Sequence, residues 1–505
     1  MKKRFGKLLA LLLCLVMALS LGLAGCGKTP SEGGTPPDGN EEIKPGDNDP
    51  NTKPGDEDPG TKPGDEDPGT KPGDDDPTQD TFTVSYRKGY TPTRFEYVSN
   101  EVTKLADGVY LVANTITLQN GAMKGKTSVV YTIEIDLEKA NVVAGTKGNV
   151  AYGFDWTKAA PYQTALDWEA ATGGHVYASI NADFFGGQSV NAFVKDGVIV
   201  KAGHNDNGNY DYKNTSSDVP ASAPLLFGVK GTTAQIAPIV KVDGDPTTAK
   251  VKEQFVKAKL TYGLEIGKTM YALKTDQAPS TTEVSYIANG SVSVNGCAVK
   301  VDVSKGPAGM EILEVVTPER RTEYKAEDGI AWIVAGSKTN TIANYLKGLK
   351  VGEKMSLSVT SPDGTWNGYE TILGCRQALV IDDEIASTVT LENTNSAQGQ
   401  DIPRTAVGVK DGKVVLIAVE SMYYYKRDKE GDTHGLNLPE LAEFAYYYGC
   451  TDAANFDGGG STHLVVHPEG EEAKTVIRSA DTAGWGLKDT RVVVNAFLIT
   501  SRKGN

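Results

Sequence analysis

Apolar residues after about position 100 gather in short runs, and several of these runs alternate apolar with polar positions. Alternation is typical of a strand with one buried face, and a short unbroken apolar run is typical of a strand buried on both faces. The runs that predict strands are Val109–Leu118, Ser128–Leu137, Val176–Ile180, Ala192–Val200, Leu225–Val229, Met355–Thr360, Ala378–Ala386, Ala406–Val409, Val414–Val419 and Val492–Ile499. The dipeptides Asp196-Gly197 and Asp411-Gly412 lie in or between such runs and favour hairpin turns.

Helical patterns are few. One spans Tyr162–Thr172, and a second spans Ile342–Leu349 with Asn340 as its expected cap. A third runs from a cap at Asn437 to a stop at Gly449. Because strands and helices do not alternate regularly, we predict an α+β fold with mixed, strand-rich sheets and a few helices, in one large domain.

The first 26 residues have the pattern of a bacterial lipoprotein signal segment. A basic start precedes the apolar run Leu8–Leu23, and the segment ends Leu23-Ala24-Gly25-Cys26, which resembles a lipobox. The resemblance implies cleavage before Cys26 and lipidation of its sulfur, although an uncleaved membrane anchor of marginal length stays open. Both alternatives place the rest of the chain outside the cytoplasm, and the first predicts an extracellular protein anchored by lipid to the bacterial membrane.

Residues 27–80 predict a disordered linker. A nine-residue unit rich in proline, glycine and acidic residues begins at Lys44, Lys53, Lys62 and Lys71 and contains almost no apolar side chain. This segment carries 16 acidic and 5 basic side chains, so it holds most of the chain's net charge of −14. The predicted folded domain, residues 81–505, is only mildly acidic, which argues against a nucleic-acid partner.

Cysteines and histidines give no metal pattern. Cys14 and Cys26 belong to the signal segment, and the remaining Cys297, Cys375 and Cys450 allow at most one disulfide. We therefore expect no cofactor and no metal site. A divalent cation such as calcium stays an open alternative, although nothing in the sequence indicates one.

The segment Asn455–Ser461 combines a carboxylate, three glycines and a hydroxyl between two apolar runs. Glycine allows positive φ and a close approach of a ligand to the backbone, and successive N–H groups in such a turn can bind an anion. A tight structural turn is the alternative. Asp457 and Ser461 favour a functional site because they add polar groups to the glycine turn.

Other polar clusters lie at predicted strand ends. Asn181 and Asp183 follow one strand, Arg404 and Thr405 open a hairpin that ends in Glu420-Ser421, and Asp489-Thr490-Arg491 open a strand that contains Asn495. A weaker cluster is Gly203-His204-Asn205-Asp206. Turn capping and surface exposure are the structural alternatives for these residues.

Known catalytic patterns are missing from the sequence. It lacks a Gly-x-Ser-x-Gly elbow, a His-Glu-x-x-His pair and any phosphate-binding or dinucleotide motif. By elimination, the chemistry would use carboxylates and arginines.

Several of these segments together resemble the phosphodiester glycosidase family. The resemblance rests on Pro403–Gly408, Leu441-Ala442, Asn455–Ser461, Arg491-Val492 with Asn495, and the earlier Asn181–Phe185. The chain departs from the family where Glu420-Ser421 replaces a common Asp-Gly, and where His463 replaces a small residue.

This resemblance implies hydrolysis of the glycosidic bond of a sugar-1-phosphodiester, with release of the sugar and a phosphomonoester. N-acetylglucosamine-1-phosphodiesters of cell-envelope or capsular glycopolymers are the candidate substrates. The implied catalytic residues are Asp457, Glu420 and Asp183. The implied substrate- and phosphate-binding residues are Arg404, Thr405, Gly458, Gly459, Gly460, Ser461, Arg491, Asn181 and Asn495. A related carboxylate hydrolase acting on another glycan or at a P–O bond, and a non-catalytic glycan-binding lipoprotein, are the alternatives.

Overall fold

A computed structural model describes residues 82–148, 156–203, 225–241, 254, 257–386, 389, 402–421, 433–482 and 485–502. The chain divides into two units, Met1–Thr78 and Gln79–Asn505. The predicted signal segment, the linker and residues 204–206 of the weaker polar cluster lie outside the described residues. Among the described helices, none has the length and apolar character needed to cross a membrane.

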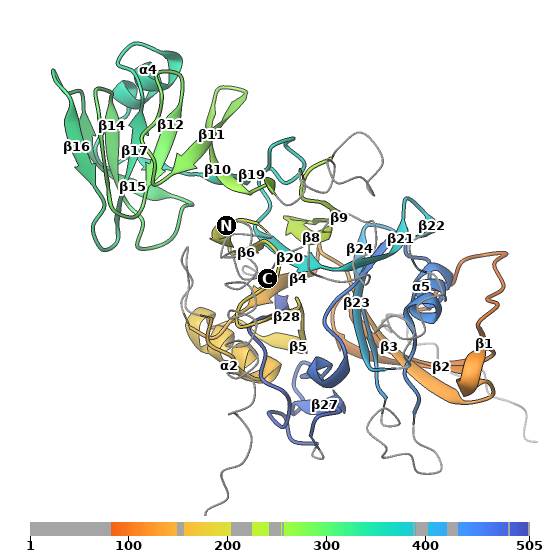
Figure 1. Cartoon of the computed structure of the whole chain (residues 1–505). Coiled ribbons are helices and arrows are strands. Elements are labelled where there is room, and N and C mark those ends of the chain that lie inside the picture. Colours follow the sequence, from red (N-terminus) through yellow and green to blue (C-terminus); the bar gives the residue numbers. More distant parts are fainter. Residues whose placement is uncertain are drawn as a thin grey trace, which may run out of the picture. The chain divides into compact units, whose positions relative to one another are not determined.

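A large antiparallel sheet, called sheet A here, contains eight strands. In order across the sheet they are β1 (Phe95–Ala106), β2 (Val109–Leu118), β3 (Thr127–Ile135), β24 (Lys413–Val419), β23 (Arg404–Lys410), β25 (Asp452–Asn455), β21 (Gln377–Ile381) and β22 (Glu384–Ile385). Helix α5 (Leu438–Tyr447) packs on one face of sheet A (Figure 1).

A second antiparallel sheet, called sheet B here, packs against the other face of sheet A. Its strands in order are β27 (Lys474–Ile477), β26 (Leu464–Val466), β5 (Val176–Asn181), β28 (Ala496–Ser501) and β4 (Ala140–Gly145). Helix α2 (Pro161–Thr172) covers its outer face, where Ala165 meets Val176 and Leu498 (Figure 1).

Strand β24 has an unbroken apolar sequence, and the packing on its two faces explains why. Leu416 and Ala418 belong to the core between the two sheets, whereas Val415 and Ile417 belong to the core under α5. Both faces of this strand are covered, so alternation with polar residues disappears.

Two further sheets share another core. The strands of the first are β7 (Val198–Lys201), β6 (Phe193–Lys195), β20 (Thr371–Cys375), β8 (Leu225–Lys230) and β9 (Thr233–Pro238). The strands of the second are β18 (Lys354–Met355), β15 (Met310–Val316), β14 (Ala298–Asp302), β17 (Ile330–Ala335), β12 (Val284–Ile287), β11 (Thr269–Thr275), β10 (Thr261–Ile266) and β19 (Ser358–Thr360). Helix α4 (Thr341–Gly348) packs on the second, and β13 (Ser291–Val294) pairs with β16 (Thr322–Lys325) beside it (Figure 1).

The described residues form a mostly β structure with a small helical share, so the α+β prediction holds in its strand-rich part. The three predicted helices are present as α2, α4 and α5. Asn340 caps α4, and Asn437 caps α5 through a capping box with Glu440. Side-chain caps satisfy N–H groups that the first turn leaves unpaired, which is why both caps could be predicted from the sequence.

Both predicted hairpin turns are confirmed. Asp196 and Gly197 have φ of 52° and 74°, and Asp411 and Gly412 have φ of 50° and 76°. Two successive positive φ values are what a tight hairpin turn needs, and Asp-Gly supplies them at low cost.

Three predicted strands are corrected by the structure. The run Ala378–Ala386 is a hairpin of β21 and β22, because Asp382 and Asp383 turn with φ of 50° and 66°. The run Met355–Thr360 divides into β18 and β19, which pair with different neighbours.

The strand predicted for Val492–Ile499 begins only at Ala496. Val493 makes an isolated bridge with Ala159, and Val492 is exposed. Arg491 therefore lies in a loop before β28 and does not open a strand.

Candidate active site

The ends of strands from sheets A and B converge at one place. Asp457 follows the end of β25 in sheet A, and Asp183 follows the end of β5 in sheet B. The backbone N–H of Asp457 donates to the carbonyl oxygen of Ala182 at 3.0 Å. The side-chain amide of Asn181 donates to the carbonyl oxygen of Asp457 at 2.5 Å. These two bonds hold the two carboxylate-bearing loops together.

The glycine turn after Asp457 forms a short 3-10 helix, η3 (Gly459–Ser461). Gly459 has a φ of +61°, and its N–H donates to the carbonyl oxygen of Pro403 at 2.8 Å. A Cβ on Gly458 would lie 2.7 Å from that same oxygen, and a Cβ on Gly460 would collide with the carboxylate of Asp481. All three positions thus require glycine, one for its backbone angle and two for close packing.

Asp183 is a buried carboxylate in a dense set of hydrogen bonds. Ser189 Oγ and the backbone N–H of Asn191 donate to Oδ2, the latter at 3.0 Å, and the Asn191 side chain donates to Oδ1 at 3.3 Å. Burial raises the pKa of Asp183 to about 6, while the donors and the nearby charge of Lys201 oppose that rise. Lys201 also donates to the carbonyl oxygen of Ser189 at 2.6 Å.

Asp457 is partly exposed and therefore more accessible than Asp183. Burial raises the pKa of Asp457 to about 6, and the negative charge of Asp183 adds to the rise. A hydrogen bond from Ser461 and the charge of Arg491 lower the pKa and limit the shift. Two interacting carboxyl groups that both titrate near neutral pH can act as a base, a nucleophile or an acid.

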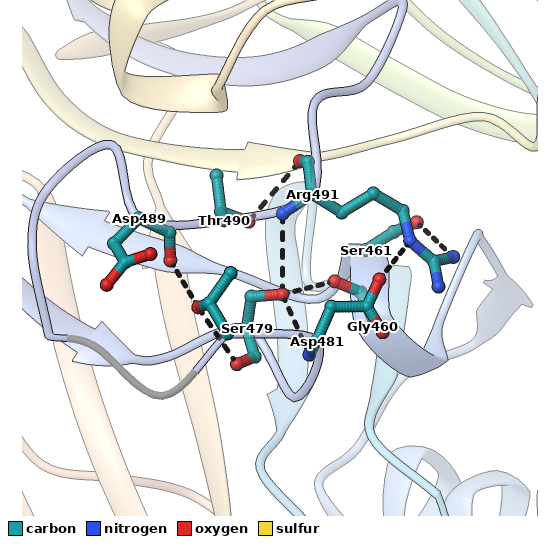
Figure 2. A network of polar contacts seen from close by, with 8 residues as sticks. Gly460, Ser461, Ser479, Asp481, Asp489, Thr490 and Arg491 are labelled. Carbon is teal, nitrogen blue, oxygen red and sulfur yellow. Dashed lines mark hydrogen bonds and ion pairs between the residues drawn. The ribbon is translucent and has the colours of Figure 1, made fainter. Parts of the chain in front are cut away.

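Arg491 reaches the glycine turn through a polar network (Figure 2). Its Nε pairs with Asp481 Oδ2 at 2.5 Å, and its Nη1 donates to Ser461 Oγ at 3.4 Å. Ser479 Oγ donates to the carbonyl oxygen of Gly460 at 2.5 Å and ties the same turn to the loop of Asp481. The Arg491 side chain is 42% exposed, so this cation can meet a ligand from solvent.

Glu420 directly follows Val419, which pairs with Arg404 in the β23–β24 ladder. Arg404 is only 3% exposed, and its Nε donates to the carbonyl oxygen of Leu436 at 2.8 Å. Glu420 accepts a hydrogen bond from Thr433 Oγ1 at 3.2 Å. Arg404 is thus built into the wall of the site.

Glu420 also faces a cation and an aromatic ring. Its Oε1 lies 3.7 Å from Arg478 Nε, and the Arg478 guanidinium lies 4.7 Å from the ring centroid of Trp485. Trp485 is 54% exposed, which is unusual for a side chain of this size.

The remaining predicted site residues are buried supports. Thr405 Oγ1 donates to Asn181 Oδ1 at 3.0 Å and lies 3.2 Å from Thr462 Oγ1. Asn495 Oδ1 accepts from the backbone N–H of Asp183 at 2.8 Å. These side chains bond to the loops that carry the carboxylates, so they fix the loops' positions.

His463, the departure noted in the sequence, is buried beside the turn. Burial lowers the pKa of His463 to about 4, although Asp489 and the backbone of Gly486 oppose the shift. The imidazole is therefore neutral at pH 7 and adds no charge to the site.

Sequence reasoning missed several residues that shape the site. Ser189 and Asn191 hold Asp183 but lie in a loop with no distinctive pattern, and Asp481 and Arg478 lie in segments that look like ordinary surface. Trp485 was missed as well, although its position between two glycines could have singled it out as an aromatic residue in a loop.

A cavity of about 870 Å³ lies elsewhere in the described part of the chain. Its lining includes Trp168, Lys195, Tyr262 and Lys305 but none of the predicted site residues. The converging strand ends are the stronger candidate site, because the carboxylates with raised pKa values are there.

Comparison with solved structures gives distant likenesses. One is a hypothetical protein from Synechocystis, with 16% identity and a TM-score of 0.41 over 81% of this chain and 69% of that chain. Another is the zebrafish N-acetylglucosamine-1-phosphodiester alpha-N-acetylglucosaminidase catalytic domain, auto-inhibited by its pro-peptide, with 13% identity and a TM-score of 0.39 over 80% of this chain and 89% of that chain. No curated protein matches the chain.

Comparison with family models is more informative. Residues 288–500 match the phosphodiester glycosidase family. The matched segment contains the glycine turn, Arg404, Glu420 and Arg491, whereas Asn181 and Asp183 lie before it. The family resemblance predicted from the sequence is thus confirmed over residues 288–500.

Proposed function

We propose that the chain hydrolyses the C1–O bond of a sugar-1-phosphodiester and releases a free sugar and a phosphomonoester. One structural relationship carries the proposal: the carboxyl groups of Asp183 and Asp457, whose pKa values burial raises to about 6, lie on joined loops beside a glycine turn that contacts the exposed Arg491. The family match supports glycosidase-type chemistry at this site.

The two aspartates have different proposed roles because their exposure differs. Cleavage of a glycosidic bond passes through an oxocarbenium-like transition state, which an adjacent carboxylate stabilises, attacks or supplies with activated water. Asp457 is the accessible carboxylate and takes that role. Asp183 is buried and tunes the charge of Asp457, while Glu420 supplies a second carboxylate at the edge of the site.

The phosphate of the substrate is the proposed ligand of Arg491 and the glycine turn. A leaving phosphomonoester has a second pKa of about 6, so it departs with less help from a general acid than a sugar hydroxyl needs. A guanidinium binds two phosphate oxygens at once, and backbone N–H groups of the turn can add further donors. Arg404 is proposed to support this arrangement as a buried structural residue, since its Nε already donates to the carbonyl oxygen of Leu436.

Trp485 is the proposed platform for the sugar. An exposed indole offers an apolar face for the C–H groups of a pyranose ring, with polar groups at its edge. Arg478 packs against this ring and also faces Glu420, so the platform is tied to the carboxylate side of the site.

The substrate is proposed to be a glycopolymer of the cell envelope or capsule, reached from a lipid anchor at Cys26. The basic, apolar and Leu-Ala-Gly-Cys order of residues 1–26 supports lipidation. Replacing Cys26 with alanine should release the protein from the membrane fraction. Normal retention of that variant would exclude the anchor.

A panel of sugar-1-phosphodiesters with identification of both products tests the proposed function. Free sugar together with a phosphomonoester is the expected outcome. A sugar phosphate would instead indicate hydrolysis at the P–O bond. Binding without turnover across the panel would indicate a glycan-binding protein.

A further inference from the structure

A second group of ionisable side chains lies at the far ends of the strands that form the active site. Glu169 lies in the last turn of α2, His175 precedes β5, and His467 follows β26. The opposite end of β5 carries Asn181, and six residues of strand span roughly 20 Å. The group is therefore separate from the proposed catalytic carboxylates.

We propose that Glu169, His175 and His467 bind a divalent transition-metal ion, with Zn²⁺ as the best fit. One ligand atom from each side chain lies within 4.8 Å of the others. His175 Nδ1 and Glu169 Oε1 are 3.2 Å apart. In a tetrahedral zinc site with bonds of about 2.0–2.1 Å, neighbouring ligand atoms are about 3.3 Å apart. This pair is thus already at the spacing that zinc requires.

The surroundings of His175 indicate which of its ring nitrogens carries the proton and which directs a lone pair at the Glu169 carboxylate. Its Nε2 lies 3.0 Å from the carbonyl oxygen of His467, which can only accept a hydrogen bond, so the proton of a neutral ring sits on Nε2. Nδ1 then presents its lone pair to Glu169 Oε1. Two acceptors at this distance need a proton or a metal ion between them. Metal-binding histidines commonly donate their other N–H to a carbonyl group in this way.

Glu169 is oriented by a separate bond, because its Oε1 accepts from the backbone N–H of Val176 at 2.8 Å. Its side chain is 21% exposed and that of His175 is 32% exposed, so an ion can enter from solvent.

His467 completes the group. Its ring centroid lies 4.3 Å from that of His175, and within the described part of the chain its buried Nδ1 has no hydrogen-bond partner. Three protein ligands would leave a fourth position for water.

The donor types select among metals. Two imidazoles and one carboxylate suit Zn²⁺ and related transition metals, whereas Ca²⁺ prefers six or more oxygen ligands. Zinc bound here would link the end of α2 to the ends of two strands of sheet B.

Calorimetry on the untagged full chain, stripped with a chelator and dialysed, tests the proposal. Titration with Zn²⁺ should give one site per chain and raise Tm, since an ion that binds only the folded state stabilises it. Ca²⁺ should give no matching site. Replacement of zinc by Co²⁺ should give the visible absorption of a tetrahedral site. Absence of a Zn²⁺ site in the wild type would overturn the proposal.

Two variants locate the ion. His467→Gln removes one imidazole, and Glu169→Gln keeps an oxygen for the Val176 N–H while removing the charge. Each variant should weaken zinc binding at least about tenfold, because loss of even a hydrogen-bond partner of a metal ligand typically lowers metal affinity about 10–100-fold. Asp167→Asn on the same helix is the matched control and should bind zinc as the wild type does. Unchanged affinity in both variants would place the zinc elsewhere and refute the assignment. If one variant lowers Tm without metal, the other variant and the Co²⁺ spectrum of the wild type decide.

Discussion

The side-chain amide of Asn181 donates a 2.5 Å hydrogen bond to the main-chain carbonyl oxygen of Asp457, across 276 residues of sequence. The same asparagine accepts from Thr405 Oγ1, so one buried side chain joins the ends of β5, β23 and β25. Buried amides bonded on both sides hold their partners in one arrangement. The position of the proposed catalytic carboxylate is thereby fixed by both sheets.

Asp457→Asn should lower turnover at least about a hundredfold with a small change in Tm, because it removes the accessible charge and keeps the side chain's shape. The measurement is kcat on a sugar-1-phosphodiester, with a thermal melt of the same preparation. Asp452→Asn, at the other end of β25, is the matched control and should retain activity. Full activity of Asp457→Asn would reduce Asp457 to a turn residue.

Asp183→Asn should move the acid limb of the pH–rate profile to lower pH. In the wild type, an ionised Asp457 is needed, so the rate falls as pH drops through about 6. The charge of Asp183 raises the pKa of Asp457, and removal of that charge lowers it. Asp457 then stays ionised in more acidic solution.

The readout for Asp183→Asn is the position of the limb on a plot of kcat/KM against pH, whatever the maximal rate. Asp196→Asn, in the exposed β6–β7 turn, should leave the limb where it is; asparagine tolerates the positive φ at that position. A limb that stays in place or moves to higher pH in Asp183→Asn would contradict the proposed interaction.

Arg491→Lys should impair a sugar-1-phosphodiester far more than a neutral aryl glycoside of the same sugar. The Arg491 guanidinium can make two parallel hydrogen bonds to the leaving phosphate, and these strengthen as negative charge develops there in the transition state. Lysine cannot make both bonds, so the variant should have a lower kcat as well as a higher KM. Arg404→Lys should instead affect both substrates alike, because Arg404 is buried and bound to Leu436. The comparison is kcat/KM for both variants on both substrates. Equal losses for Arg491→Lys on the two substrates would remove it from the phosphate site.

Local features of the fold were predictable from the sequence. The caps Asn340 and Asn437, the Asp-Gly hairpins and the glycine turn after Asp457 each depend on a few neighbouring residues. Such signals act through local backbone geometry and survive in almost any tertiary setting.

Features that depend on distant partners were not predictable. The apolar run at Val492 looked like a strand, but only residues from Ala496 onward find a partner in sheet B. Arg491 consequently sits in a loop held by Asp481, and neither the loop nor the pair has a sequence signal.

The two side-chain clusters show the same limit. Ser189 and Asn191 surround Asp183 only because the chain folds back after β5. Glu169, His175 and His467 come together from three elements, and their spacing along the chain matches no metal motif.

Hydrolysis in ¹⁸O-labelled water measures the central claim most directly, because it reports which bond of the sugar-1-phosphodiester breaks. Cleavage between C1 and oxygen transfers the water oxygen to the sugar, while the phosphomonoester keeps the original bridging oxygen. We predict label at C1 of the released sugar and none in the phosphomonoester, with the labelled product lost in Asp457→Asn. Label in the phosphate group and none in the sugar would contradict glycosidic hydrolysis and assign the site to phosphodiester cleavage at phosphorus.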